Sequence, residues 1–120
     1  MEKELLKVIK DELIDLGINY EYGEYTGKLK YPYAVGEYSE KDYQYETNIT
    51  NGDFILVFFH RGSELDLINI KEQVKERFAD YRKVVDGGTI YVSYRNKLPI
   101  READLNRMEI YLDTKTMKGE

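Results

Sequence analysis

Residues 54–59, Phe-Ile-Leu-Val-Phe-Phe, form the longest apolar run of this 120-residue chain. Six residues are too few to span a membrane, but they match a strand that is apolar on both faces. Asn51-Gly52 lies just before the run, and both residues tolerate the positive φ of a hairpin turn. We therefore expect this turn to join a strand ending near Ile49 to a strand over 54–59, which lies mid-sheet with a helix packed over it.

Two segments carry apolar residues at helical spacing. The first spans 4–16 and stops before Gly17, which suits a left-handed cap position. The second follows Arg61-Gly62 and opens with Ser63, a favoured N-cap residue. Its apolar positions recur every three or four residues, at Leu67, Ile70, Val74, Phe78 and Tyr81.

The remaining segments favour short strands. Residues 20–22 and 43–47 alternate with period two, and Pro32 between them is barred from a central strand. Later in the chain we expect a turn at Asp86-Gly87-Gly88, a strand over 90–94, a loop at Leu98-Pro99-Ile100 and a last strand over 108–115. In that last strand, Met108, Ile110 and Leu112 are expected to face inward.

Together these elements predict one α+β domain over residues 1–115, followed by a short flexible tail over 116–120. The expected order is α-β-β-β-α-β-β. Consecutive strands meet at hairpins, so the sheet should be mainly antiparallel with both helices packed on one face.

Composition excludes several classes of protein. The chain has no cysteine, which removes disulfides and thiolate metal sites. Its first residues, Met-Glu-Lys-Glu, lack the layout of a secretion signal, so we expect a soluble protein made in the cytoplasm, with no membrane association. A net charge of −5 argues against specific nucleic-acid binding.

The two halves of the chain differ in charge. Residues 1–60 hold twelve acids and six bases, whereas residues 61–120 hold eleven acids and twelve bases, including all six arginines. In the simplest interpretation, this difference arises by chance, and the charged residues lie on ordinary solvent-exposed faces. The alternative is a molecule with one acidic and one basic side, suited to head-to-tail contact between copies.

No constellation of catalytic residues is evident. His60 is the only histidine and has no partner recognisable from the sequence. Asp11 and Asp15 lie one helical turn apart among lysines, as on a solvated face, and Gly87-Gly88 lacks the rest of a phosphate-binding loop. We therefore predict no enzymatic activity, no catalytic residue, no metal and no cofactor.

Tyrosine is in excess, and eight of the twelve tyrosines lie between residues 20 and 45. A tyrosine ring buries a large apolar surface and loses little side-chain entropy, which suits protein interfaces. We expect Tyr20 and Tyr22 to belong to the core. The loop tyrosines are better interface candidates: Tyr31, Tyr33 and Tyr38.

Three stretches, taken in order, resemble small tail-completion proteins of phages and prophages of Gram-positive bacteria. The first is Tyr31-Pro32-Tyr33 with Gly36-Glu37-Tyr38, and the second is the strand that ends in Arg61-Gly62-Ser63. The third begins at Leu98-Pro99-Ile100 and continues through residues 104–108 into the terminal strand. Residues 39–50 depart from the family pattern, because they are rich in charge and tyrosine.

This resemblance implies a sandwich of sheet and helices and a tail terminator or tail-to-head joining protein of a long-tailed phage. Such a protein forms a ring, commonly of six copies, on the head-proximal end of the tail tube. Its partners would be the tube protein, the head connector and copies of itself, first in the host cytoplasm and then at the head–tail junction of the virion. The contact residues inferred for it are Tyr31, Tyr33, Glu37, Tyr38, Arg61 and Ser63.

Three other functions are compatible with this sequence. A head-completion adaptor between portal and tail would share this size and charge. A cytoplasmic module that binds a peptide or small ligand could use the tyrosines as its pocket. An enzyme centred on His60 is the most remote alternative.

Overall fold

The structure, a computed structural model, describes residues 1–102 and 104–119, without the side chains of residues 101 and 102. Within these residues, two helices and six strands follow one another: α1 (Glu2–Asp15), β1 (Tyr20–Tyr22), β2 (Tyr33–Gln44), β3 (Ile49–His60), α2 (Glu64–Arg77), β4 (Tyr81–Val85), β5 (Gly88–Glu102) and β6 (Leu105–Lys118).

The strands form one twisted sheet in the order β1-β2-β3-β6-β5-β4. Among the described residues, β1 pairs parallel with β2, and the other four pairings are antiparallel. The α+β class and the mainly antiparallel sheet are therefore confirmed, with one strand more than expected.

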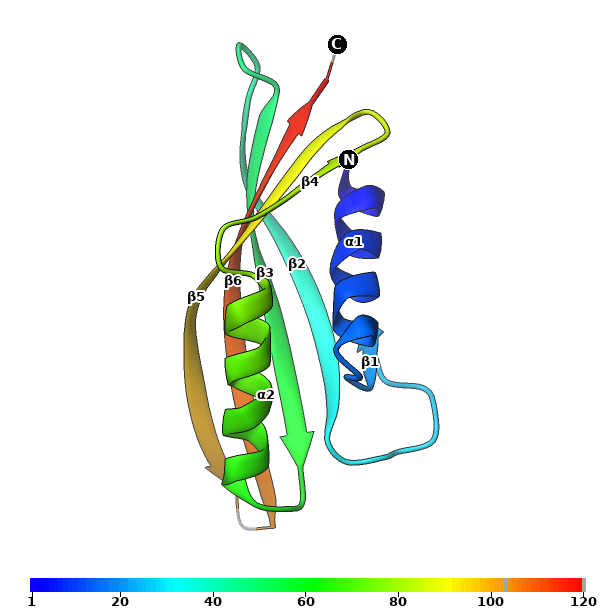
Figure 1. Cartoon of the computed structure of the whole chain (residues 1–120), viewed down its shortest axis with the longest axis vertical. Coiled ribbons are helices and arrows are strands. Elements are labelled where there is room, and N and C mark those ends of the chain that lie inside the picture. The colour runs from blue at the N-terminus through cyan, green and yellow to red at the C-terminus, as the bar shows by residue number, and fades with distance from the viewer. Residues whose placement is uncertain (103, 120) are drawn as a thin grey trace.

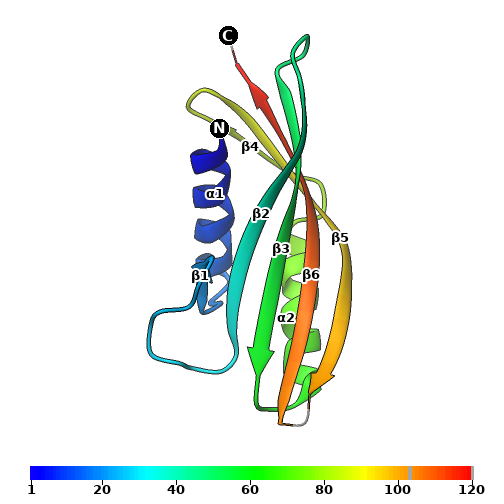
Figure 2. The same cartoon turned by 180° about the vertical axis from the view of Figure 1, so that it is seen from behind.

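Both helices pack on the same face of this sheet. α2 lies over β3, β6 and β5 and runs along them, and α1 lies beside β1 and β2 (Figure 1). Seen from behind, β2, β3, β6 and β5 have no helix in front of them (Figure 2). The core therefore lies between the helices and one sheet face, with Leu5, Ile9 and Leu13 from α1 and Leu67 and Val74 from α2.

The helix ends form as expected. Gly17 has φ +79°, and the N–H groups of Gly17 and Ile18 donate to the carbonyls of Ile14 and Leu13. At the start of α2, Ser63 Oγ accepts from the N–H of Leu65 at 3.1 Å. Each cap satisfies helix-end backbone groups that otherwise lack an intrahelical partner.

The central strand is also confirmed. β3 is third in the sheet and buries Phe54, Leu56 and Phe58 against the helices. On β6, the inward positions are Met108, Ile110 and Leu112, as expected, and all three are buried. Ile55, Val57 and Phe59 point to the other face and are only partly buried.

The expected turn at Asn51-Gly52 is wrong. Both residues lie inside β3, where Gly52 pairs with Glu40 and Thr114. The chain turns instead at residues 45–48, and Asn48 takes the positive φ of 55°. The predicted strand over 43–47 therefore keeps only Tyr43 and Gln44, because pairing of β2 with β3 continues down to Ile49.

The expected extension of the second helix to Tyr81 is also wrong. α2 ends at Arg77, and Tyr81 opens β4, the additional strand. Tyr81 still packs against Phe78, but it does so from the strand. The centroids of the two rings are 5.3 Å apart, in an edge-to-face arrangement. β4 then turns into β5 through Gly87, whose φ of +94° confirms the predicted turn.

Residues 98–100 lie in β5, not in a loop. Pro99 is tolerated there because β4 pairs only with residues 88–92, so β5 is an edge strand at Pro99. The last strand also continues past 115: Thr116 is buried and pairs with Thr50 and Ile90. Residues 116–118 are therefore part of the sheet and not of the expected tail, whose last residue, Glu120, lies outside the described residues.

Candidate functional site

The sheet face that carries no helix is the candidate site, and we call it the open face. Strand alternation assigns its members, because residues two apart on a strand share a face. On the three central strands it is formed by Tyr33, Val35, Glu37, Asp53, Ile55, Val57, Phe59, Arg107, Glu109, Tyr111 and Asp113.

The middle of the open face is apolar. Val35 pairs with Val57, and Glu37 pairs with Ile55, so three aliphatic side chains meet on neighbouring strands. They line a shallow hollow together with Phe59, Arg107 and Glu109. Partly exposed aliphatic groups with a charged border are typical of surfaces that bind another protein.

An aromatic cluster occupies one end of this face. The ring of Tyr33 stacks on Phe59 at 5.1 Å and contacts Tyr25 at 4.7 Å and Tyr31 at 5.6 Å. The Arg61 guanidinium lies over the Tyr31 ring at 5.5 Å. The cluster thus links the loop before β2, the end of β3 and the corner that precedes α2.

A hydrogen-bonded triad borders the hollow on β6. Tyr111 Oη donates to Glu109 Oε1 at 2.7 Å, and the Arg107 guanidinium donates to Glu109 Oε2 at 2.8 Å. The hydrogen bond from Tyr111, followed by that from Arg107, lowers the pKa of Glu109 below its usual value of 4.5. The carboxylate is therefore held charged and in a fixed orientation beside the apolar centre.

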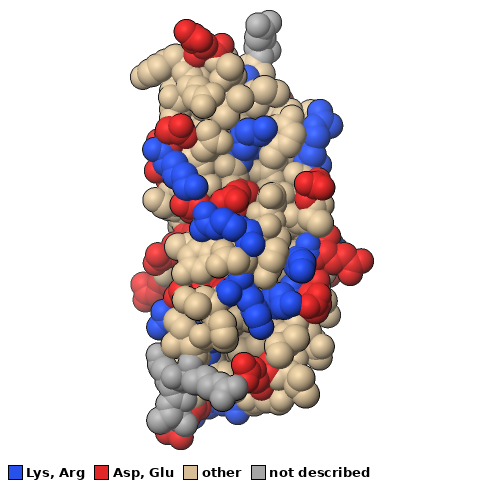
Figure 3. All heavy atoms as spheres, turned by 90° about the vertical axis from the view of Figure 1, so that its left-hand side faces the viewer, with Lys and Arg blue, Asp and Glu red and all other residues tan. Residues whose placement is uncertain are grey.

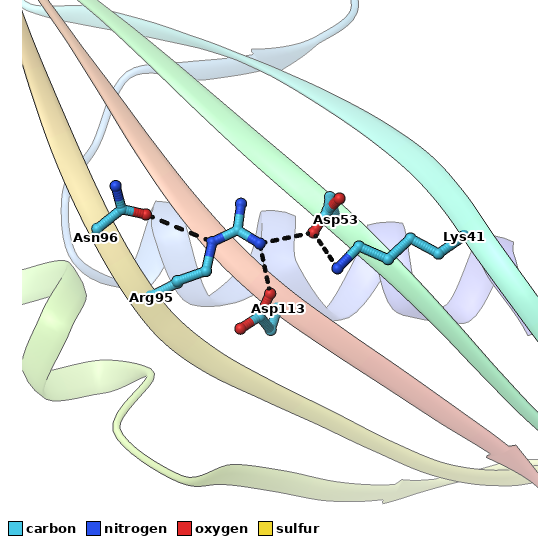
Figure 4. Close-up of polar contacts among 5 residues, drawn as sticks. All are labelled: Lys41, Asp53, Arg95, Asn96 and Asp113. Carbon is cyan, nitrogen blue, oxygen red and sulfur yellow. Dashed lines mark hydrogen bonds and ion pairs between the residues drawn. The ribbon is translucent and has the colours of Figure 1, made fainter.

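A cluster of charges lies further along the same face (Figure 4). Asp53 on β3 pairs directly with Asp113 on β6, and Arg95 on β5 bridges them at 3.1 and 3.0 Å. Lys41 lies at the irregularity in β2, and its Nζ is 3.1 Å from Asp53 Oδ1. Asn96 Oδ1 accepts a hydrogen bond from Arg95 Nε at 3.4 Å. The bulge at residue 95 in β5 directs Arg95 toward both carboxylates.

Charges of both signs continue around the border of the sheet. Figure 3 shows the side of the molecule that lies to the left in Figure 1, where β5 runs. Lys and Arg side chains gather in the middle of this side and alternate with Asp and Glu. The apolar centre of the open face is therefore bordered by charges that would orient a partner rather than attract a single sign of charge.

The structure brings together four of the six predicted contact residues. Tyr31, Tyr33 and Arg61 meet in the aromatic cluster, and Glu37 is exposed on the same face. Ser63 adjoins them in sequence, but its hydroxyl is used to cap α2.

Tyr38 lies on the opposite, helix-covered face, which the prediction did not anticipate. It packs against the core, and burial raises the pKa of its hydroxyl. Tyr22 is likewise not the core residue expected, because it is 47% exposed, whereas Tyr20 is buried as predicted. Tyr22 Oη accepts the backbone N–H of Tyr38 at 3.2 Å, which connects β1 to β2 beyond their backbone pairing.

His60 has a partner that sequence reasoning missed. Its Nε2 lies 2.8 Å from Asp66 Oδ2, in the first turn of α2. The ring is buried, and the contact ties the end of β3 to the helix that follows. The spacing of six residues across a strand-to-helix corner carries no recognisable motif, which is why the pair was not predicted.

Two features are absent from the described residues, 1–102 and 104–119. Within them, no group of three or more His, Asp or Glu side chains is arranged to hold a metal ion. Within the same residues, neither helix has the length and apolarity needed to cross a membrane.

Comparison with known proteins found no protein-family model and no curated protein that matches the chain.

Proposed function

We propose that this protein is a structural assembly protein that completes the tail of a long-tailed phage. In this proposal it forms a ring on the head-proximal end of the tail tube, stops tube growth and joins the tail to the head. The proposal of a tail comes from the resemblance of the three sequence stretches. The proposal of an assembly role is carried by one observation, the open face with its apolar centre.

The open face suits a broad protein partner. Val35, Ile55 and Val57 offer a shallow apolar surface, and Tyr33 extends it into the aromatic cluster. In protein interfaces, tyrosines such as Tyr33 are enriched among the residues that contribute most of the binding energy, and the apolar groups around them exclude water. We assign this face to the end of the tail tube, whose subunits would present a flat protein surface.

Charge supports the same role. DNA passes through the lumen of a tail tube, and a net charge of −5 disfavours sticking of DNA to a ring of such subunits. Subunits of a closed ring meet through two different surfaces of the same chain. The uneven division of acids and bases between the two halves of the chain fits that kind of contact.

The test is Val57→Lys, which places a charge in the centre of the open face without touching the core. Ile14→Lys is the matched control, since Ile14 is 51% exposed on α1. Both variants should unfold at temperatures close to that of the wild type. Each would be expressed in a lysogen lacking the gene, and particles from the induced lysate would be examined by electron microscopy.

The proposal expects the control to restore infectious particles and Val57→Lys to leave filled heads separated from over-long or irregular tails. Tails of normal length beside unfilled or leaking heads would instead assign the protein to head completion. Intact, infectious particles from the lysogen without the gene would contradict any role in the virion.

A further inference from the structure

We propose that the tip of the β2–β3 hairpin of one copy binds a groove over β4, β5 and β6 of a neighbouring copy. This inference rests on the proposed function, because it names the contact that would join copies in the ring. The hairpin tip comprises residues 42–48, and the groove is centred on Tyr91, with Arg82 and Lys115 beside it.

The hairpin tip projects beyond the body of the molecule (Figure 1). Tyr45 is 83% exposed and Tyr43 is 40% exposed, and their rings meet edge to face at 4.8 Å. Two adjacent exposed aromatic rings at the end of an arm form an anchor of the kind that fills a pocket on a partner.

The turn that presents these rings is held in one conformation. Tyr43 Oη donates to Asn48 Oδ1 at 3.0 Å, and Thr47 Oγ1 donates to Gln44 Oε1 at 3.2 Å. The N–H of Lys118 donates to the Asn48 carbonyl at 3.0 Å, which fastens the turn to β6. An arm ordered before binding loses less conformational entropy when it docks.

The groove has an aromatic floor between two cations. Lys115 Nζ lies 4.5 Å from the centroid of the Tyr91 ring, and the Arg82 guanidinium lies 6.0 Å from it. Asp80 and Asp113 also line the groove, and Arg95 binds the Asp113 carboxylate at 3.0 Å. At the neighbouring edge, Val84 is 65% exposed and adds apolar surface.

The charges of the two surfaces select which contact forms. Residues 42–48 contain Asp42 and Glu46 and no base, whereas Arg82 and Lys115 line the groove beside Asp80 and the Arg95-bound Asp113. Opposite charges favour a tip against a groove, while like charges disfavour a tip against a tip or a groove against a groove. The partner best matched to each surface is therefore the other surface on a second copy of this chain.

The experiment exchanges the charges of the two surfaces. The tip variant is Asp42→Lys with Glu46→Lys, and the groove variant is Arg82→Glu with Lys115→Glu. Exposed residues supply controls with the same change of net charge: Glu24→Lys with Glu76→Lys, and Lys3→Glu with Lys10→Glu. A carbodiimide, which couples a lysine to a carboxylate in direct contact, is applied to mixtures of ¹⁴N- and ¹⁵N-labelled full-length protein at millimolar concentration.

The wild type and both controls are expected to give cross-links between differently labelled copies, joining Lys115 to Asp42 or Glu46. Each charge variant alone should lose them. A mixture of the two variants should regain them with the chemistry inverted, from lysine at 42 or 46 to glutamate at 115. Absence of these cross-links in the wild type, or failure of the mixture to restore them, would overturn the inference.

Sedimentation of the cross-linked wild type separates this inference from the proposed function. Closed species larger than a dimer support both. A dimer joined by two reciprocal tip-to-groove cross-links supports the contact and contradicts the ring. The opposite outcome is also distinguishable. If Val57→Lys causes tail defects but the wild type gives no tip-to-groove cross-link, the proposed function stands and this contact is contradicted.

Discussion

Gly52 lies against the ring of Tyr38, and an ideal Cβ built at Gly52 would stand 2.5 Å from Tyr38 Oη and 2.6 Å from Cε1. The glycine therefore serves close packing between β3 and β2, and not a turn. Tyr38 in turn rests on the core. This contact explains why an Asn-Gly pair sits in the middle of a strand.

Gly52→Ala should lower the free energy of unfolding by about 1–3 kcal/mol, because the partly buried Tyr38 ring must move to admit the methyl group. Gly27→Ala is the control, since a Cβ there would meet only Tyr25 atoms at 3.7–3.8 Å. The control should change stability by less than roughly 0.5 kcal/mol. Urea unfolding followed by circular dichroism measures both, and equal stabilities would contradict the packing role of Gly52.

The elements that could be predicted from the sequence are those fixed by local pattern. The stripe of α1, the cap at Ser63 and the apolar run over 54–59 each depend on residues within a few positions of one another. Their type and burial follow from that local chemistry, whereas their bounds differ, since α1 spans Glu2–Asp15 and β3 spans Ile49–His60. The α+β class follows from them, because two amphipathic helices need a sheet face to cover their apolar stripes.

The errors arose where contacts distant in sequence outweigh local preference. Asn51-Gly52 has the composition of a turn, yet pairing with β6 keeps it in a strand. Pro99 has the composition of a loop, yet it pairs with Met108 because β5 has a vacant edge there. Tyr81 fits a helical stripe, yet it starts a strand.

The candidate site was predictable only in part for the same reason. The aromatic cluster draws on residues that the tyrosine-rich segment made conspicuous. Arg95, by contrast, reaches Asp53 and Asp113 across separations of 42 and 18 residues, and no spacing rule connects them. The open face as a whole follows from the placement of both helices on one side of the sheet, which was predicted, although its members were not.

Removing Arg95 should expose repulsion between two carboxylates. Asp53 and Asp113 are directly opposite each other, and like charges in that position destabilise a sheet. We expect Arg95→Met to cost about 1 kcal/mol at neutral pH, since these side chains are partly exposed. The double variant Arg95→Met/Asp113→Asn should recover most of the loss. A double-mutant cycle by urea unfolding measures the coupling, and simple additivity would contradict it.

Glu109 should make stability sensitive to acid. Its pKa is lowered in the folded protein, so its ionised form stabilises the fold at pH values above the usual 4.5. That stabilisation is lost as pH falls below 4.5 and through the folded pKa. The wild type should therefore exceed Glu109→Gln in stability by a constant margin above this value, and by a shrinking margin below it. Urea titrations between about pH 7 and pH 3 check the trend, and a margin independent of pH would contradict it.

Tyr20→Phe should stabilise the protein. The Tyr20 hydroxyl is buried and finds no hydrogen-bond partner among the described residues, so the fold bears its desolvation without compensation. Removing it should raise the free energy of unfolding by about 1 kcal/mol. Burial also raises the pKa of Tyr20, so the wild type should lose stability as pH rises above the usual 10.0, and the variant should lose less. Tyr45→Phe, at an 83% exposed position, is the control and should match the wild type in both measurements. A loss of stability in Tyr20→Phe would show that the hydroxyl is satisfied, for example by a bound water.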